Sequence, residues 1–366
     1  IDEARRIYEE LLQRHPNHQR FHYELCQLRT AKDFEHVSQM KAMLRGTPLP
    51  PPRNIFLYYA LGKELEDLEA WDEAFEFYET AGNAVKSVAD YQVDSDLELI
   101  DALIETCDEC WLQDAPPAVP AHSAPTPIFI VGLPRSGTTL TERMVASHSH
   151  VRSIGETFFL QMALCCGSGS AYSGTPGPAE VRAASTADIG RIASLYLEAV
   201  DYKLGSEPYF IDKLPENFLY LGFVAKAFPG ARIIHVKRHP MDVCFAMYKQ
   251  SYFRFAYTLE DAGRFYVAYD DLMGHWRSLL GDGIREIQYE DLVARPEHEI
   301  QRLLDYIGLD FEAACTAPHQ NPASSRTASK IQIREGIHQR SIGRWKRFER
   351  HLTGLEDYLV AHGIDV

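Results

Sequence analysis

The sequence predicts an α/β fold, a parallel β-sheet flanked by helices, preceded by an all-α domain of helical repeats. Three observations lead to this prediction. The first hundred residues have helical periodicity and internal similarity, residues 115–127 are rich in proline, and the remainder alternates short apolar runs with helical stretches. At ~150 residues per domain, a chain of 366 residues is long enough for two domains.

The net charge of −15 comes from 37 Lys and Arg against 52 Asp and Glu, and it is unevenly distributed. Residues 1–120 contain 24 acidic and 11 basic residues, whereas the remainder contains 28 and 26. A strongly acidic chain is repelled by a nucleic-acid backbone, so the composition argues against nucleic acid as a partner. The nearly neutral second part can still carry a local positive field.

Seven cysteines, an odd number in a long chain, do not suggest a disulfide framework and favour a reducing, cytoplasmic location. Cys107 and Cys110 form a C-x-x-C pair, but a zinc site needs further ligands, so we assign no metal site.

No apolar run approaches the ~20 residues of a membrane span. The chain opens at Ile1 within a helical pattern, so we expect a trimmed start, and a leader could have been lost with the trimming.

Residues 58–81 carry apolar and small residues at helical spacing. The positions that match the tetratricopeptide pattern are Leu61, Gly62, Ala74, Tyr78 and Ala81. Small residues are needed there because two antiparallel helices touch closely. Residues 4–16 resemble the second helix of the same unit, about two periods of ~34 residues earlier. The resemblance implies a docking or self-association module over residues 1–114, and a generic array of helical hairpins is the alternative.

The boundary between the two predicted domains is the segment 115–127, which contains five prolines. Proline lacks the backbone N–H that a helix needs, so we expect a stiff, extended linker here. The second domain is then expected over residues 128–366.

This second domain opens with an apolar strand, residues 128–131, which runs into G-L-P-R-S-G-T-T and a helical stretch. A strand, a glycine-bearing turn and a helix aim backbone N–H groups at an anion, which predicts a P-loop-type sheet. Thr138 stands where ATPases have lysine, and Arg135 supplies the positive charge instead. The predicted anion-binding residues are Pro134, Arg135, Ser136, Gly137, Thr138 and Thr139.

The segment P-R-S-G-T-T-L resembles the 5′-phosphosulfate loop of sulfotransferases that use 3′-phosphoadenosine 5′-phosphosulfate (PAPS). The resemblance implies a second site for the 3′-phosphate, and Arg238, after the strand 231–236 and before a helix, fits it. The family has a serine eight residues after this arginine, where Ala246 stands here. The predicted 3′-phosphate pocket is therefore incomplete unless Ser251 or a C-terminal residue compensates.

Two further segments resemble the same family. The strand that begins at residue 284 leads into Y-E-D, and the resemblance implies that Tyr289 packs on the adenine, a half-buried core tyrosine being the alternative. Residues 326–350 contain eight basic and two acidic residues and resemble a C-terminal loop that closes over the nucleotide, although such a cluster is also typical of a solvated face. The cofactor contacts selected from this segment are Ser329, Arg340 and Arg344.

The resemblance also implies the catalytic residues. Glu156 follows the second strand, where tyrosylprotein sulfotransferases carry a glutamate base, and we assign it as general base. A helix-capping glutamate is the alternative, with His148 or His150 as the base. Lys213 follows the third strand, where the family keeps a lysine that steadies the bridging oxygen, and a surface lysine is the alternative. Arg135 completes the predicted catalytic set.

The predicted function is transfer of a sulfuryl group from PAPS to an acceptor hydroxyl by in-line displacement, with 3′-phosphoadenosine 5′-phosphate (PAP) as product. A phosphate-loop kinase is one alternative, and an inactive repeat scaffold that binds nucleotide, favoured by Ala246, is the other. The acceptor is a small molecule, a glycan or a peptide, because fold and donor site do not fix it. The Gly-, Ser- and Pro-rich segment 167–178 is either a lid over the acceptor or a plain connection.

Overall fold

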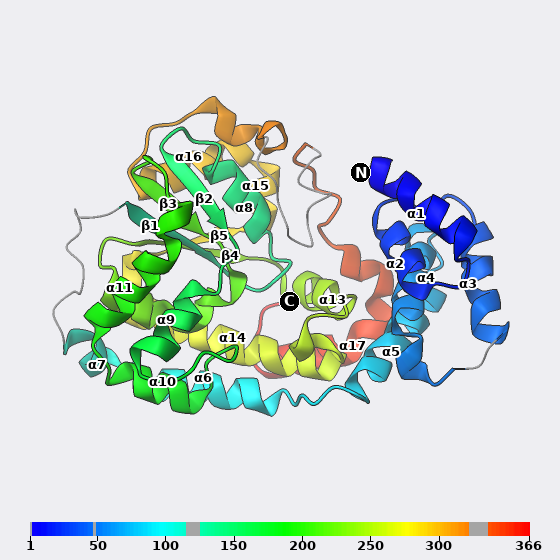
Figure 1. The fold of residues 1–366 in the computed structure, drawn as a ribbon, viewed down its shortest axis with the longest axis horizontal. Helices are drawn as coiled ribbons and strands as arrows, with labels where there is room; N and C mark the ends of the chain where they lie inside the picture. The colour runs from blue at the N-terminus through cyan, green and yellow to red at the C-terminus, as the bar shows by residue number, and fades with distance from the viewer. Residues whose placement is uncertain (1, 47–48, 115–124, 322–335) are drawn as a thin grey trace. The chain divides into compact units, whose positions relative to one another are not determined.

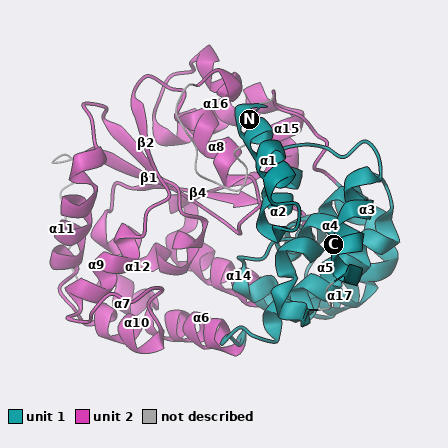
Figure 2. Cartoon of the chain, turned by 45° about the vertical axis from the view of Figure 1, so that its right-hand side comes forward, with its two compact units in different colours: residues 1–93, 240–267, 343–366 teal, residues 94–239, 268–342 magenta. Residues whose placement is uncertain are grey.

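The computed structural model describes residues 2–46, 49–114, 125–321 and 336–366 (Figure 1). By its internal contacts the chain divides into two compact units (Figure 2). The first, here called the helical unit, consists of residues 1–93, 240–267 and 343–366. The second, here called the sheet unit, consists of residues 94–239 and 268–342. No helix in the described parts of the chain is long and apolar enough to span a membrane.

The helical unit begins with five helices joined by short loops. They are α1 (Asp2–Arg14), α2 (Gln19–Gln27), α3 (Glu35–Gly46), α4 (Ile55–Asp67) and α5 (Trp71–Lys86), with the 3-10 turn η1 (Pro51–Arg53) before α4. Gly62 on α4 lies against Tyr78 on α5, since an added Cβ atom would stand 2.7 Å from the tyrosine ring. This is the close contact that the small residues predict, and the N-terminal helices fit a repeat pattern.

Later parts of the chain complete the helical unit. They are α13 (Pro240–Tyr248), η4 (Arg254–Ala256), the start of α14 (Leu259–Leu280), η9 (Arg344–Phe348) and α17 (Glu349–Ala361). The ring of Phe75 stacks on His351 with centroids 4.4 Å apart, and Trp71 meets Phe348 edge to face at 5.5 Å. The repeat helices therefore share their core with segments from the second half of the chain. Each compact unit combines separate segments of the chain, whereas the predicted domains are continuous ranges. The predicted domain boundaries therefore stay a prediction.

The sheet unit contains five parallel strands. They are β1 (Thr126–Val131), β2 (Val151–Gly155), β3 (Tyr209–Asp212), β4 (Arg232–Lys237) and β5 (Ile284–Gln288), in the order β2-β3-β1-β4-β5. A parallel sheet with flanking helices and a helical N-terminal region confirms the predicted fold class. Because β1 lies between β3 and β4, the carboxyl ends of these three strands meet at one edge of the sheet, where ligands of open α/β sheets bind.

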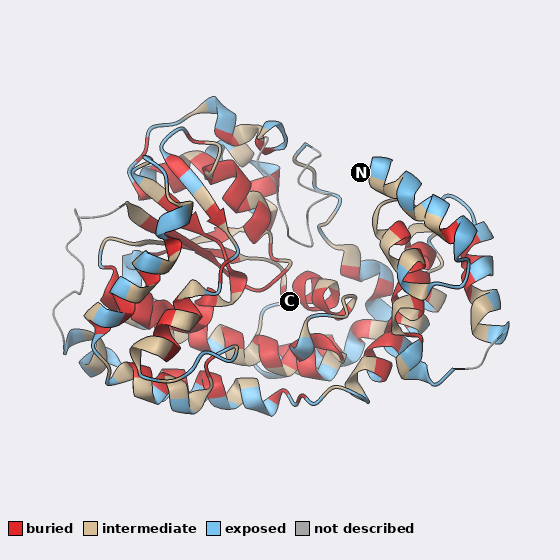
Figure 3. Ribbon diagram, in the orientation of Figure 1, coloured by how far each residue is buried: buried red, intermediate tan, exposed pale blue. Residues whose placement is uncertain are grey.

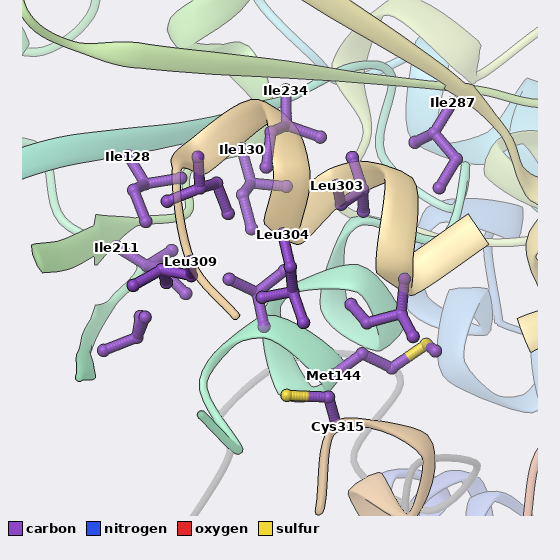
Figure 4. Close-up of a cluster of buried hydrophobic side chains, with 14 of the residues drawn as sticks. Ile128, Ile130, Met144, Ile211, Ile234, Ile287, Leu303, Leu304, Leu309 and Cys315 are labelled. Carbon is purple, nitrogen blue, oxygen red and sulfur yellow. The ribbon is translucent and has the colours of Figure 1, made fainter. Parts of the chain in front are cut away.

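Helices cover both faces of this sheet. The helices of the sheet unit, some of which lie in an outer layer, are α6 (Asp94–Thr106), α7 (Glu109–Gln113), α8 (Thr138–Val145), α9 (Phe159–Gly167), α10 (Pro178–Ser185), α11 (Ile189–Val200), α12 (Leu221–Ala227), the end of α14, α15 (Tyr289–Ala294) and α16 (Pro296–Ile307). Ile128 and Ile130 point into a core shared with α8 and α16 (Figure 4). Phe129, between them, packs against Tyr196 of α11 on the other face, 5.9 Å between centroids. Figure 3 accordingly shows the central strands as buried.

Two connecting segments that the sequence analysis singled out, residues 115–127 and 167–178, lie beside elements of the sheet unit. Strand β1 already begins at Thr126, so the last residues of the proline-rich segment belong to the sheet, and residues 115–124 lie outside the described chain. Between α9 and α10, residues 168–177 have no regular structure, and the N–H of Gly177 donates to Glu180 at 3.0 Å where α10 begins. A lid function of this segment stays a prediction.

Candidate active site

The turn between β1 and α8 has a backbone that depends on its two glycines. Gly132 (φ +145°) and Gly137 (φ +110°) are in a region that favours glycine, and a Cβ atom on Gly132 would come closer than 3.0 Å to the carbonyl oxygen of Val236. Arg135 also has a positive φ of 71°, which is uncommon for a residue with a side chain. The turn is therefore held tightly against β4, immediately before the N-terminus of α8.

The same turn offers groups that suit an anion. Gly137 has no side chain with which to cap α8, so the first backbone N–H groups of the helix are available to a ligand. The Ser136 side chain is only 1% exposed, and its Oγ atom has no hydrogen-bond partner among the described residues. A buried hydroxyl without a partner is costly unless a ligand satisfies it.

Arg238 and Tyr289, predicted from distant segments, both lie at this turn. One Nη of Arg238 donates to the carbonyl oxygen of Arg135 at 2.9 Å, and the other donates to the carbonyl oxygen of Ser341. The Arg238 guanidinium lies 5.0 Å from the ring centroid of Tyr289. The Tyr289 ring in turn contacts Gly137. The structure therefore brings Arg135, Gly137, Arg238 and Tyr289 together, and their contacts with a cofactor stay a prediction.

Glu290 is a structural partner of this cluster that sequence reasoning missed. Its carboxylate accepts from the backbone N–H of His239 at 3.1 Å and from the side-chain amide of Gln288 at 2.6 Å. The signal available in the sequence was its place directly after Tyr289, beyond the end of β5. Glu290 ties the residue after Arg238 to the start of α15.

The predicted catalytic residues Lys213 and Glu156 form an ion pair. Lys213, directly after β3, is fully buried, and Glu156, directly after β2, has a side chain that is 37% exposed. The Lys213 Nζ atom is also 3.5 Å from Oγ1 of Thr139 and 3.6 Å from Oε2 of Glu142. The lysine therefore lies between Thr139, at the start of α8 directly after the turn that follows β1, and the predicted base Glu156.

Three more carboxyl groups surround this pair, and the sequence analysis selected none of them. Glu142 on α8 accepts a hydrogen bond from Ser153 Oγ at 2.5 Å. Asp212 accepts hydrogen bonds from Tyr196 at 2.9 Å and Thr157 at 3.1 Å. Burial raises the pKa of Asp212 to about 7. Both carboxyl groups lie close in sequence to a predicted site residue. Glu142 is one helical turn after Thr139, and Asp212 directly precedes Lys213.

The third carboxyl group belongs to Glu216, in the 3-10 helix η3 (Pro215–Tyr220). Burial raises the pKa of Glu216, and the negative charge of Glu156 raises it further.

In the described parts of the chain, no group of three or more His, Cys, Asp and Glu side chains could hold a metal ion. Cys107 is buried and Cys110 exposed, with no disulfide at either.

Other predicted residues lie elsewhere. His148 and His150 precede β2, at the edge of the sheet opposite to Glu156, and His148 Nε2 bonds to the carbonyl oxygen of Asp310 at 3.0 Å. Arg340 is exposed in the segment that follows the undescribed residues. Ser329 lies outside the described residues.

Some candidates for the 3′-phosphate pocket belong to the helical unit, where they have other partners. Arg344 pairs with buried Glu66 at 2.6 Å, and the same carboxylate pairs with Lys249 at 2.8 Å. Ser251 exchanges a hydrogen bond with Tyr23, and Ala246 is half-buried on α13. The cofactor contact of Arg344 stays a prediction.

Comparisons with known proteins point to one family. The family model described as "Sulfotransferase family" matches residues 127–313. An "Uncharacterized protein" of Aquifex aeolicus (strain VF5) is 31% identical over 336 residues, which is 89% of this chain and 44% of that protein. A "Putative protein-tyrosine sulfotransferase" of Caenorhabditis briggsae is 23% identical over 228 residues, covering 60% of this chain and 80% of that protein.

A solved structure is also similar. The "Sulfotransferase Domain from the Curacin Biosynthetic Pathway" covers 63% of this chain and 99% of its own, with 18% identity and a TM-score of 0.43. The chain spans less than half the length of the Aquifex protein that it matches. Since the family model matches half of the residues, including all five strands and the turn after β1, the chain belongs to the sulfotransferase family.

Proposed function

We propose that this protein transfers a sulfuryl group from PAPS to an acceptor hydroxyl, with Lys213 and Glu156 as the catalytic pair. The observation that carries the proposal is the contact between these two side chains beside Thr139 of the phosphate-type turn. With donor and acceptor bound, such an arrangement would put a cation next to the leaving phosphate and a carboxylate next to the incoming hydroxyl. Membership of the sulfotransferase family supports this class of reaction.

The residues at the turn fit the phosphosulfate end of PAPS. The unpartnered Ser136 hydroxyl and the N-terminus of α8 would donate to its oxygens, and Arg135 would add a positive charge. Side chains at positions 132 and 137 would collide with the carbonyl oxygen of Val236 and the ring of Tyr289, so the two glycines keep the turn in this conformation. Pro134, Thr138 and Thr139 complete the proposed contacts. When bound, PAPS supplies a sulfuryl group already activated by a phosphate leaving group.

The nucleotide end of PAPS would be held by the cluster beside the turn. Arg238 would bind the 3′-phosphate and Tyr289 would pack on the adenine, a pairing supported by their mutual contact at 5.0 Å. Arg340 and Ser329 are proposed as further contacts. Arg344 would contribute only if it exchanged its pairing with Glu66 for the cofactor.

The chain's own groups have distinct tasks in this reaction. Lys213 and Arg135 stabilise negative charge that develops on the leaving phosphate side. Glu156 accepts the proton of the acceptor hydroxyl as that oxygen bonds to sulfur. Glu156 must first exchange its pairing with Lys213 for the acceptor, and its partial exposure allows this exchange.

For the acceptor we propose only chemical classes of molecule, and for other partners only the surface that they would contact. A small molecule, a glycan or a peptide with a free hydroxyl would serve as acceptor. The helical unit, which fits a repeat pattern, is the proposed surface for a protein partner or for self-association. A cytoplasmic location would agree with the absence of disulfides among the seven cysteines.

Two measurements test the proposed function. Calorimetry should detect binding of PAP and no comparable binding of ATP with Mg²⁺, because Thr138 replaces the lysine of ATPases. Preferential binding of ATP with Mg²⁺ would favour a kinase instead. Transfer of labelled sulfate from PAPS to members of an acceptor collection, followed by mass spectrometry, should identify a sulfated product. Binding of PAP without transfer to any acceptor class would favour the inactive scaffold.

A further inference from the structure

We infer that Glu142 is a positioning residue that holds Lys213 on the donor side of the site while Glu156 is released to act as base, an inference that rests on the proposed function. Lys213 has two carboxylate neighbours, and they differ in their surroundings. The side chain of Glu156 is 37% exposed, whereas that of Glu142 is 9% exposed. An exposed carboxylate can exchange its partner for a substrate, but a buried one that loses its partner leaves an uncompensated charge.

Glu142 is fixed from two sides. It lies on α8 one helical turn after Thr139, so both side chains are on the same face of the helix. Ser153 Oγ donates to Oε1 of Glu142 at 2.5 Å, and Oε2 of the same carboxylate is 3.6 Å from Lys213 Nζ. Among the described residues, three side chains contact the ammonium, and two of them, Thr139 and Glu142, belong to α8, the helix that follows the turn proposed to bind the donor.

This arrangement has a consequence during the reaction. When the acceptor proton moves to Glu156, that carboxylate becomes neutral and its attraction for the lysine is lost. Without Glu142, the fully buried Lys213 would then have lost both carboxylate partners, which is costly in a buried site. With Glu142 present, the charge on the lysine stays compensated and its Nζ atom stays near the donor turn.

Calorimetric titration of the full chain with PAP separates positioning from a plain charge effect. Glu142→Gln and Glu156→Gln each remove one negative charge beside Lys213. A charge effect alone would strengthen binding of the anionic PAP in both variants. Positioning predicts opposite results: Glu142→Gln weakens PAP binding by about tenfold, because Lys213 shifts toward Glu156, whereas Glu156→Gln binds PAP as tightly as the unaltered protein or more tightly.

Two further variants sharpen the test. Glu142→Gln combined with Glu156→Gln should recover most of the lost PAP affinity, because nothing then draws Lys213 away from the phosphate. Ser153→Ala retains both carboxylates but removes the hydroxyl that orients Glu142, so a smaller loss in the same direction is expected. Thermal unfolding of each variant establishes that it is folded before the titration, and Ser153→Ala carries the test if Glu142→Gln fails to fold.

The outcomes are distinguishable. Equal PAP affinity in Glu142→Gln and Glu156→Gln, or no recovery in the double variant, overturns the role of Glu142 while the proposed function stands. Failure of the unaltered protein to bind PAP overturns the proposed function and, with it, the role of Glu142.

Discussion

The ring of Tyr289 contacts the backbone of Gly137 so closely that a Cβ atom on that glycine would come within 3.0 Å of the ring carbon Cδ2. Gly137 is the residue before α8, and Tyr289 is the first residue of α15. The contact joins the turn proposed to bind phosphosulfate to the aromatic side chain proposed to bind adenine. The two parts of the donor site therefore depend on each other for their positions.

Gly137→Ala should impair both PAP binding and stability. The alanine would have to adopt a φ of +110° and would also collide with Tyr289, so we expect a loss of at least about 2 kcal/mol in unfolding free energy and weak or absent PAP binding. Gly281→Ala is a matched control, since Gly281 also has a positive φ but no atom within 4 Å of an added Cβ. Equal effects of the two substitutions on PAP binding would contradict the proposed contact.

Lys213→Ala and Glu156→Gln should each lower kcat by ~10² or more; Glu156→Gln should retain PAP binding, whereas Lys213→Ala should weaken it by about tenfold, the loss expected of Glu142→Gln, without abolishing it. The lysine would no longer stabilise the leaving phosphate, and the glutamine could not accept the acceptor proton. The two readouts are steady-state kinetics with PAPS and an acceptor that the unaltered protein sulfates, and calorimetry with PAP. Lys32→Ala, which removes an exposed lysine of the helical unit, should retain full turnover. Near-native kcat in either site variant would remove that residue from the catalytic assignment.

Asp212→Asn should change how stability depends on pH. Below pH ~4 the carboxyl group is protonated in both states and contributes nothing. As pH rises from ~4 to about 7 the unfolded chain ionises Asp212 while the folded chain keeps it protonated, so the folded state loses stability until its own pKa is passed. The variant lacks this loss, so its unfolding free energy should gain on the unaltered protein by up to roughly 4 kcal/mol across this window.

Urea unfolding at pH 4.5, 6 and 8 measures this difference. Asp282→Asn, at an exposed aspartate of the same unit, should follow the unaltered protein at every pH. Curves for Asp212→Asn that stay parallel to those of the unaltered protein would mean that Asp212 is ionised in the folded state at neutral pH.

Gly62→Ala should destabilise the helical unit, because the new methyl group would stand 2.7 Å from the ring of Tyr78 at the contact between α4 and α5. We expect a loss of about 1–3 kcal/mol, the usual cost of overpacking a close helix contact. Gly46→Ala at the end of α3, where an added Cβ meets no atom within 4 Å, should stay within about 0.5 kcal/mol of the unaltered protein. Thermal unfolding followed by circular dichroism compares the two variants.

Much of the sheet unit could be predicted because its sequence and structure follow the same local rule. The central strands β1, β3 and β4 contain short apolar runs, and Lys213, Arg238 and Tyr289 directly follow their strands. In a parallel sheet the carboxyl ends share one edge, so residues far apart in sequence meet there. The motif after β1 then indicates which chemistry this edge serves.

The acids around Lys213 could not be selected in the same way. Glu142 occupies an ordinary position in an amphipathic helix, and only the packing of α8 against β2 and β3 turns it toward Ser153 and the lysine. Asp212 ends an apolar strand, and its burial depends on Tyr196 and Thr157 from other elements. Tertiary contacts of this kind leave no periodic signal in the sequence.

The contact between α17 and α5 has a consequence for synthesis of the protein. Asp72 on α5 bonds to His351 on α17, 279 residues later in the chain. At 5–20 residues per second, a ribosome needs on the order of 15–60 s to supply that partner after α5 has emerged. Until then Trp71 lacks its contact with Phe348, and Phe75 lacks its stacking partner His351. Helix α5 thus leaves the ribosome long before its core is complete, and its aromatic side chains offer an apolar surface that a chaperone can cover in the meantime.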